Sequence, residues 1–189
     1  MGGPRTALLI RADADFDLAV RLRQGNTTIG EVYSFVSGLY FRGKLAYAKA
    51  FGASPENISA ASVIVPGLGL VHPNMALNCE QLRRIGSIPA DESLDEFIGP
   101  LLRTALNLND EAGPDCRYVL LGSIATGKYT RPLLNVFGDR LLFPADFVGR
   151  GNMSRGGLML RCARSGDELS YVAVLGATLR GPRPPKLKP

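Results

Sequence analysis

The sequence predicts a single α/β domain built on a mainly parallel sheet of about five strands, with helices on both faces. Three observations predict this class. Short apolar runs typical of buried strands alternate with longer segments of helical periodicity. The chain has 189 residues, enough for one domain with a full core. Its hydrophobic content of 46% and charged content of 21% are those of an ordinary globular protein.

The first elements alternate between strand and helix. Residues 6–10 form a short apolar run, which predicts a buried strand. A helix is expected over 16–24, with Asp13 or Asp15 as its N-cap. Thr28 is expected to cap a second, longer helix, because apolar residues recur after it at i, i+3, i+4 and i+7.

The middle of the chain continues this alternation. The apolar run 61–65 predicts a second buried strand, which ends in a loop at Pro66. A strong helical stripe covers 94–108, with Pro100 inside it at a start or kink. Thr130 is expected to cap a short helix that ends at Gly138.

Three further strands are expected, over 117–121, 141–143 and 169–175. The segment 158–164 is open to two interpretations. Its alternating apolar residues fit a strand of a hairpin, whereas its lack of β-branched residues and its C-terminal cations favour a helix. We favour the helix.

Residues 1–179 are expected to form the domain, because no repeat or linker divides them. Residues 180–189 form a proline-rich tail with four cations and no acid. The net charge of +5 favours polyanionic partners, although many proteins are this basic for solubility alone. The tail is also a candidate for docking onto a protein or onto a second copy of the chain.

Composition excludes several classes of function. No apolar run approaches the roughly 20 residues that span a bilayer, so no membrane association is expected. Arg11 follows the first apolar run at once, which argues against a secretory signal. Three scattered cysteines and a single histidine argue against disulfides and metal cages and suit the cytoplasm. We therefore expect no metal and no cofactor.

The segment 149–157 holds four glycines and two arginines in nine positions. If a helix begins there, Gly151 and Ser154 would lie beside its free backbone amides. Arg150 and Arg155 would add charge-assisted hydrogen bonds to a bound phosphate. The alternative is a glycine-rich turn with solvated arginines.

The segment 122–128 matches the GxxxxGK pattern of a phosphate-binding loop, in which Lys128 would neutralise phosphates. Tyr129 stands where such loops carry a magnesium-binding Ser or Thr, so an ordinary strand-to-helix turn is the favoured interpretation.

Two residues are candidate catalytic groups. Asp13, in an acidic run after the first predicted strand, would serve as a nucleophile or metal ligand, although helix capping explains it more simply. His72, in the loop after the second predicted strand, would serve as a general base, although a lone loop histidine is commonly a surface residue.

Aromatic residues and cations also interleave around Arg42. Tyr40, Arg42, Lys44 and Tyr47 lie on one amphipathic segment, which suits base stacking combined with phosphate contacts. The alternative places the aromatic rings in the core and the cations in solvent.

Three segments follow one another in a familiar order: the Phe-Arg-x-Lys-Leu-Ala-Tyr-Ala helix at 41–48, Gly-Leu-Val-x-Pro at 69–73, and the strand at 118–121 with the glycine loop after it. Together, over about residues 39–160, they resemble small bacterial α/β domains that are distantly similar to the YaaA peroxide-stress family and to proteins associated with deazaguanine-type nucleic-acid modification. The resemblance implies an α/β fold and a role related to nucleic acid. It assigns no catalytic residue.

Three functions are therefore predicted for one pocket, where the loops 66–74, 122–129 and 149–157 converge. The first is binding of nucleic acid or a nucleotide. The second is a small hydrolase or transferase that acts on an anionic metabolite or nucleobase. The third is a protein-interaction module that uses the basic tail. The residues expected to hold phosphates or stack on bases are Arg150, Gly151, Ser154, Arg155, Lys128, Arg42 and Tyr129.

Overall fold

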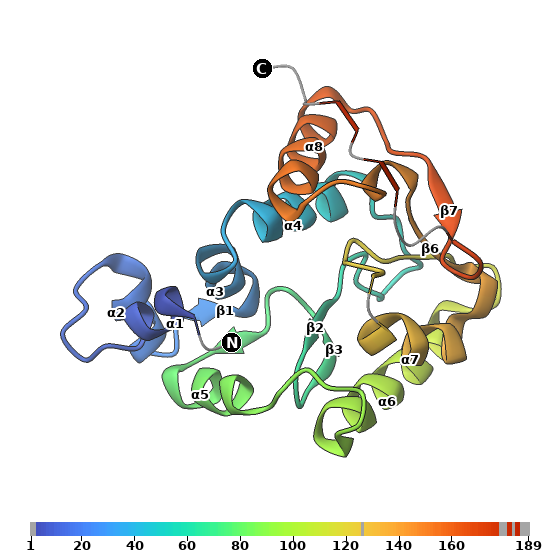
Figure 1. The fold of residues 1–189 in the computed structure, drawn as a ribbon. Helices are drawn as coiled ribbons and strands as arrows, with labels where there is room; N and C mark the ends of the chain where they lie inside the picture. Colours follow the sequence, from blue (N-terminus) through green and yellow to red (C-terminus); the bar gives the residue numbers. More distant parts are fainter. Residues whose placement is uncertain (1–2, 126, 178–180, 183, 186–189) are drawn as a thin grey trace.

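The fold consists of helices grouped around three small β-sheets (Figure 1). The computed structural model describes residues 3–125, 127–177, 181–182 and 184–185. Within this part of the chain the strands are β1 (Thr27–Thr28), β2 (Val63–Val65), β3 (Gly69–Val71), β4 (Ala76–Leu77), β5 (Tyr118–Val119), β6 (Leu141–Pro144) and β7 (Tyr171–Ala173). They pair as β1-β4, β2-β3 and β5-β6-β7, and only β5 and β6 are parallel. The predicted mainly parallel five-stranded sheet is therefore wrong.

The turn after β2 explains much of this difference. The Leu68 N–H donates to the Val65 carbonyl at 3.1 Å, and Gly67 has a φ of 77°. This tight turn sends the chain back along β2 as the antiparallel strand β3. A connection of three residues is too short for the crossover that a parallel pair requires. The apolar run at 61–65 thus marks a hairpin strand and not the start of a strand-helix-strand unit.

The first apolar run is a helix and not the predicted strand. Helix α1 (Pro4–Leu9) has a proline in its first turn, where the missing N–H needs no partner. It buries Thr6 and Leu9 and leaves Leu8 exposed, which is the spacing of a helix face. A run of four apolar residues after Thr6 fits either structure, and periodicity alone does not distinguish them.

The next two helices were expected. Helix α2 (Asp17–Arg23) confirms the helix predicted over 16–24, but its N-cap is Phe16, so capping by Asp13 or Asp15 is wrong. Thr28 caps helix α3 (Ile29–Val36) as predicted: its hydroxyl accepts from the Glu31 N–H, and the Glu31 carboxylate accepts from the Thr28 N–H. This is a capping box, which satisfies two free donors at once.

Four longer helices follow. Helix α4 (Leu39–Phe51) continues beyond α3 after Gly38, and helix α5 (Cys79–Ser87) was not predicted. Helix α6 (Asp95–Ala112) confirms the predicted stripe and contains Pro100. Helix α7 (Gly127–Phe137) begins before Thr130, which is buried inside it, so the predicted cap at Thr130 is wrong.

The C-terminal part confirms the helical interpretation of 158–164. Helix α8 (Asn152–Ser165) covers that segment and ends at Gly166, whose φ is 79°. Two short 3-10 turns, η1 (Gly138–Arg140) and η2 (Ala145–Phe147), flank β6. Of the described helices, none is long and apolar enough to cross a membrane.

Helix α4 joins the two hydrophobic cores of the molecule. The N-terminal core contains Leu9, Leu22, Ile29, Val32, Leu77 and Leu82. The C-terminal core contains Tyr47, Phe97, Leu101, Phe143, Phe147 and Met159. Phe41 of α4 packs against the first core, whereas Tyr47 of the same helix belongs to the second.

Helices α4 and α8 cross at a pair of glycines, Gly43 and Gly156. A Cβ added to Gly43 would lie 2.5 Å from the Gly156 carbonyl oxygen. A Cβ added to Gly156 would lie 2.8 Å from the Cα of Tyr40. Only residues without side chains permit this approach. It brings the first turns of α8 next to the α4 residues that line the candidate site.

Candidate functional site

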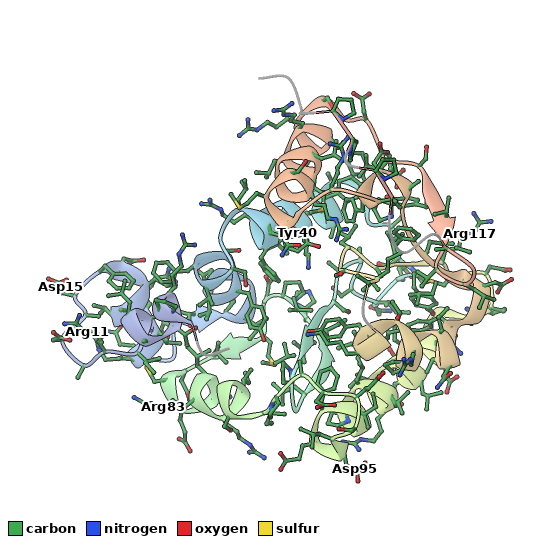
Figure 2. All side chains as sticks on the ribbon, viewed as in Figure 1. Arg11, Asp15, Tyr40, Arg83, Asp95 and Arg117 are labelled. Atoms are coloured by element: carbon green, nitrogen blue, oxygen red, sulfur yellow. The ribbon has the colours of Figure 1, made fainter. Side chains whose placement is uncertain are left out.

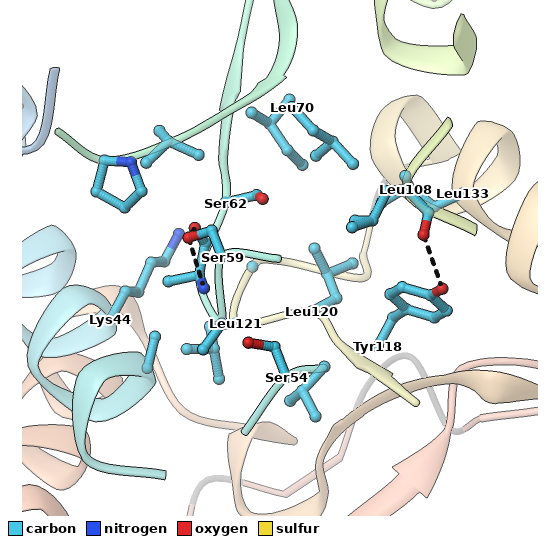
Figure 3. Close-up of a pocket in the computed structure, with 18 of the residues that line it drawn as sticks. Lys44, Ser54, Ser59, Ser62, Leu70, Leu108, Tyr118, Leu120, Leu121 and Leu133 are labelled. Atoms are coloured by element: carbon cyan, nitrogen blue, oxygen red, sulfur yellow. Dashed lines mark hydrogen bonds between the residues drawn. The ribbon is translucent and has the colours of Figure 1, made fainter. Parts of the chain in front are cut away.

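A cavity of about 430 Å³ lies between α4, the loop 53–62, the β2-β3 hairpin, β5 and α7 (Figure 3). Most of its wall is apolar. Residues that form this apolar wall include Phe41, Leu45, Ile64, Leu70, Leu120, Leu121, Leu133 and Phe137. Ligand sites in proteins typically have volumes of about 300–1,000 Å³ and walls of this kind with few polar groups. The polar groups therefore decide what this cavity can bind.

Of the described residues, two charged ones line the cavity: Arg117, which is exposed to solvent, and Lys44, which is half-buried. The Lys44 side chain extends from α4 toward the loop that carries Ser59 (Figure 3). The amine lies 4.1 Å from the centroid of the Tyr40 ring. Burial, and then the positive charge of Arg155, lower the pKa of Lys44 to about 8. No carboxylate of the described residues forms a salt bridge with Lys44. The site thus holds a poorly solvated amine without a described counter-ion.

Tyr33 lines the same cavity and carries an unpaired hydroxyl. Its side chain is only 8% exposed, and its hydroxyl has no hydrogen-bond partner among the described residues. Burial, and then the neighbouring Tyr129, raise the pKa of Tyr33, so its hydroxyl remains protonated. Leaving a buried hydroxyl unpaired costs about 1–3 kcal/mol. A ligand with an acceptor atom would remove that cost.

Several other polar groups at or beside the wall are engaged in hydrogen bonds. The Ser54 hydroxyl donates to the Ile58 carbonyl and the Ser59 hydroxyl to the Ala61 carbonyl, each at 2.6 Å. Both bonds lie within the loop 53–62, which lines the cavity. The Tyr40 hydroxyl donates to the Leu121 carbonyl at 3.4 Å, which ties α4 to the segment after β5. Lys44 is a half-buried cation of the wall and Tyr33 carries a buried unpaired hydroxyl, so these two groups are the best suited to contact a ligand.

The glycine- and arginine-rich segment lies at the start of α8, where Gly151 is the exposed N-cap. The Arg150 guanidinium donates to the Asp146 carbonyl at 2.9 Å and to the Ser154 hydroxyl at 3.4 Å. Arg155 donates twice to the Phe147 carbonyl, at 3.1 and 2.8 Å. The structure therefore brings Arg150, Ser154 and Arg155 together, with guanidinium donors directed at the backbone of η2.

The remaining predicted phosphate-binding residues are dispersed. Lys128, at the start of α7, lies 4.9 Å from the centroid of the Tyr129 ring. Tyr129 lines the cavity, and its ring meets Phe97 edge-on at 5.9 Å. Arg42 is exposed on α4. Residue 126 of the GxxxxGK segment lies outside the described residues, as do the four cations of the basic tail.

The candidate catalytic residues lie apart from the cavity wall. His72 is exposed, and its Nδ1 accepts from the Asn74 N–H at 2.9 Å. Asp13 is exposed and paired with Arg11, and the hydrogen bond from Arg11 lowers the pKa of Asp13. Figure 2 shows Arg11 and Asp15 at the outer end of the N-terminal helices, away from the central Tyr40. No group of three or more His, Cys, Asp or Glu in the described part of the chain is placed to hold a metal.

The three loops expected to converge do so only in part. Pro73 and Gly122 line the cavity together with Tyr129. The segment 149–157 contributes to the site through Arg155, whose charge acts on Lys44.

The aromatic and cationic pattern of α4 predicts Lys44 as a nucleic-acid contact, whereas no sequence pattern singles out Tyr33. Lys44 lies four residues after Tyr40 and three before Tyr47, so all three share one helix face. The position of Lys44 on the same helix face as two aromatic residues is the sequence feature that indicates a buried amine.

No family model matches the chain, and no curated protein or solved structure is significantly similar to it. The resemblance to the YaaA family therefore stays a prediction.

Proposed function

We propose that the protein binds a small organic anion with an apolar body in the cavity beside Lys44. The observation that carries this proposal is the amine of Lys44 on the wall of a cavity of about 430 Å³, without a described carboxylate partner. The apolar wall would contact the body of the ligand. The Lys44 ammonium would neutralise its anionic group, and the Tyr33 hydroxyl would donate to an acceptor atom.

Charge supports this choice of ligand. An amine with a pKa of about 8 is mostly protonated at neutral pH. Hydrogen bonds between charged groups are roughly twice as strong as neutral ones. Water screens such bonds strongly, whereas a poorly solvated site screens them less. An anion beside Lys44 would therefore also raise the pKa of this lysine and bind together with a proton at pH values above about 8.

The nucleotide binding predicted from the sequence falls within this class of ligand. A nucleobase has an apolar face, and a phosphate supplies the anion. The difference lies in the residues: Lys44, rather than the segment 149–157, would hold the charge, and Tyr129 would contact the base from the cavity wall.

The proposal is tested with anilinonaphthalene sulfonate, a fluorescent probe with an aromatic body and one anionic group. Titrations compare the wild type with Lys44→Met and with Arg42→Met, which removes an exposed cation from the same helix. We expect Lys44→Met to weaken binding about tenfold, which corresponds to about 1.4 kcal/mol. Arg42→Met should bind like the wild type.

Two further measurements complete the test. Wild-type affinity should fall as pH rises through about 8, because Lys44 loses its charge there. Competition with decanoate and with adenosine monophosphate then separates an aliphatic acid from a nucleotide as the preferred ligand. Equal affinity in all three proteins, with no dependence on pH, would refute the proposal.

A further inference from the structure

We infer that Lys44 forms an imine with aldehydes or ketones that enter the cavity. This reaction takes place in the cavity of the proposed function but does not require an anionic ligand. It gives the site a covalent chemistry in addition to binding.

The surroundings of the Lys44 amine carry the inference. A nucleophilic amine must be accessible, must not be held protonated by a carboxylate, and must have room for a substrate. Lys44 lines the cavity, and no described carboxylate forms a salt bridge with it. The amine lies 4.1 Å from the centroid of the Tyr40 ring, and it has no hydrogen-bond acceptor among the described residues. Lysines in such apolar sites are those that form imines in enzymes.

The other described lysines differ in these respects. Lys49 is exposed near the end of α4, outside the cavity wall. Lys128 lies over the Tyr129 ring at the start of α7 and is also absent from the wall. Lys49 therefore provides an internal comparison on the same helix.

The reaction is balanced without an oxidant or a reductant. The lone pair of the neutral Lys44 amine forms a bond to the carbonyl carbon, and the carbonyl π electrons move to the oxygen. The two protons that leave the nitrogen end on this oxygen, the C–O bond breaks, and water departs. The products are one imine and one water molecule, and hydrolysis reverses the step.

Tyr33 is the group suited to assist at the oxygen. Its hydroxyl lacks a described partner, and burial keeps it protonated. A hydroxyl in this state donates a hydrogen bond to the carbonyl oxygen and stabilises the negative charge that develops there during attack. The apolar wall selects carbonyl compounds with an aromatic or aliphatic body.

The experiment traps the imine in the full chain. The protein is incubated with benzaldehyde and sodium cyanoborohydride, which reduces an imine to a stable secondary amine, and the benzylated lysines are located by peptide mass mapping. At pH 8, half of an amine with a pKa of about 8 is neutral, against about 0.3% for a solvated lysine. A less basic amine is also a weaker nucleophile, so we expect Lys44 to react about tenfold faster than Lys49.

Three variants keep the test decisive. Lys49→Met should leave labelling of Lys44 unchanged. Lys44→Met should abolish the fast label, and circular dichroism verifies its fold. Tyr33→Phe keeps the ring and removes the hydroxyl, so it should slow labelling of Lys44 severalfold. The rate at Lys44 should rise with pH and level off above about 8, opposite to the pH dependence of anion binding.

The two proposals fail separately. Binding of anilinonaphthalene sulfonate without preferential labelling of Lys44 overturns the imine and leaves the proposed function standing. Fast labelling of Lys44 without binding of the probe overturns the proposed function and leaves the imine standing. Labelling at equal rates at Lys44 and Lys49 in folded protein would overturn the inference.

Discussion

Replacement of Lys44 by methionine should stabilise the folded protein at neutral pH. The folded state lowers the pKa of Lys44 from its ordinary 10.5 to about 8, chiefly through burial. Below pH 8 the lysine is charged in both states, and the folded state bears a desolvation cost of at most about 3 kcal/mol. Methionine has a similar length and no charge. After subtraction of about 0.5–1 kcal/mol for the lost contact with Tyr40 from this upper bound, we expect a net gain of up to about 2 kcal/mol.

The sign of the pH dependence follows from the same difference. Between about pH 8 and 10.5 the unfolded chain holds a proton that the folded protein has released from Lys44. Because the unfolded state binds more protons, wild-type stability rises with pH across this window. The advantage of Lys44→Met should therefore shrink from pH 8 upward and vanish near 10.5.

Urea unfolding followed by circular dichroism measures both effects. The free energy of unfolding is extrapolated to water at several pH values between 7 and 10 for the wild type, Lys44→Met and Lys49→Met. Lys49 is exposed, so its replacement should change stability by less than about 0.5 kcal/mol at every pH. A Lys44→Met protein that is less stable than the wild type at pH 7, with a difference that does not depend on pH, would refute the reasoning.

Three further outcomes are expected. In thermal unfolding, Gly43→Ala should destabilise the protein by about 1–3 kcal/mol, because its Cβ would lie 2.5 Å from the backbone of α8. Gly99→Ala should instead stabilise the protein by about 0.5–1 kcal/mol, because its Cβ would lie 3.4 Å from the nearest side-chain atom. Thr28→Ala, which removes the cap of α3, should cost about 1 kcal/mol in the same assay. If the segment 149–157 binds nucleic acid, Arg150→Ala combined with Arg155→Ala should lower the slope of log affinity against log salt by about two, and an unchanged slope would exclude that site.

Local signals in the sequence sufficed for several helices. Thr28 with Glu31 marks the start of α3, and Gly166 marks the end of α8, because each acts through neighbouring residues. Asn78 and Gln81 form an equally local capping box at α5, so that helix was also readable from the sequence. These features depend on spacing alone.

Strand pairing depended on one turn. The apolar run at 61–65 was correctly assigned to a strand, but its partner was set by the turn after Val65. Pro66 followed by Gly67 is typical of such a turn, with a proline at its second position and a positive φ at its third. Pro66-Gly67 therefore indicates a hairpin, whereas the alternation of strands and helices along the chain led to the prediction of a parallel sheet.

The site was less accessible to sequence reasoning because its chemistry arises from distant segments. The composition of 149–157 suggested free arginines, yet the carbonyl of Phe147 accepts both donors of Arg155. In the sequence Lys44 resembles a solvated cation, whereas in the fold it is half-buried and lines a cavity together with the loop 53–62 and the segment 118–122. Burial of a side chain by segments far away in the chain has no local signature.

The close crossing of α4 and α8 connects these observations. The glycine pair at the crossing brings Arg155 close enough to Lys44 for its charge to lower the pKa of the amine further. A fold optimised only for stability would place an acid beside two such cations or would replace Lys44 by an apolar residue. This chain instead keeps two unfavourable features in one cavity, a desolvated amine and the unpaired hydroxyl of Tyr33. Local costs of this kind concentrate at functional sites, where a ligand removes them. The gain of stability expected for Lys44→Met and the loss of binding expected for the same variant therefore test the same cost of burying this amine.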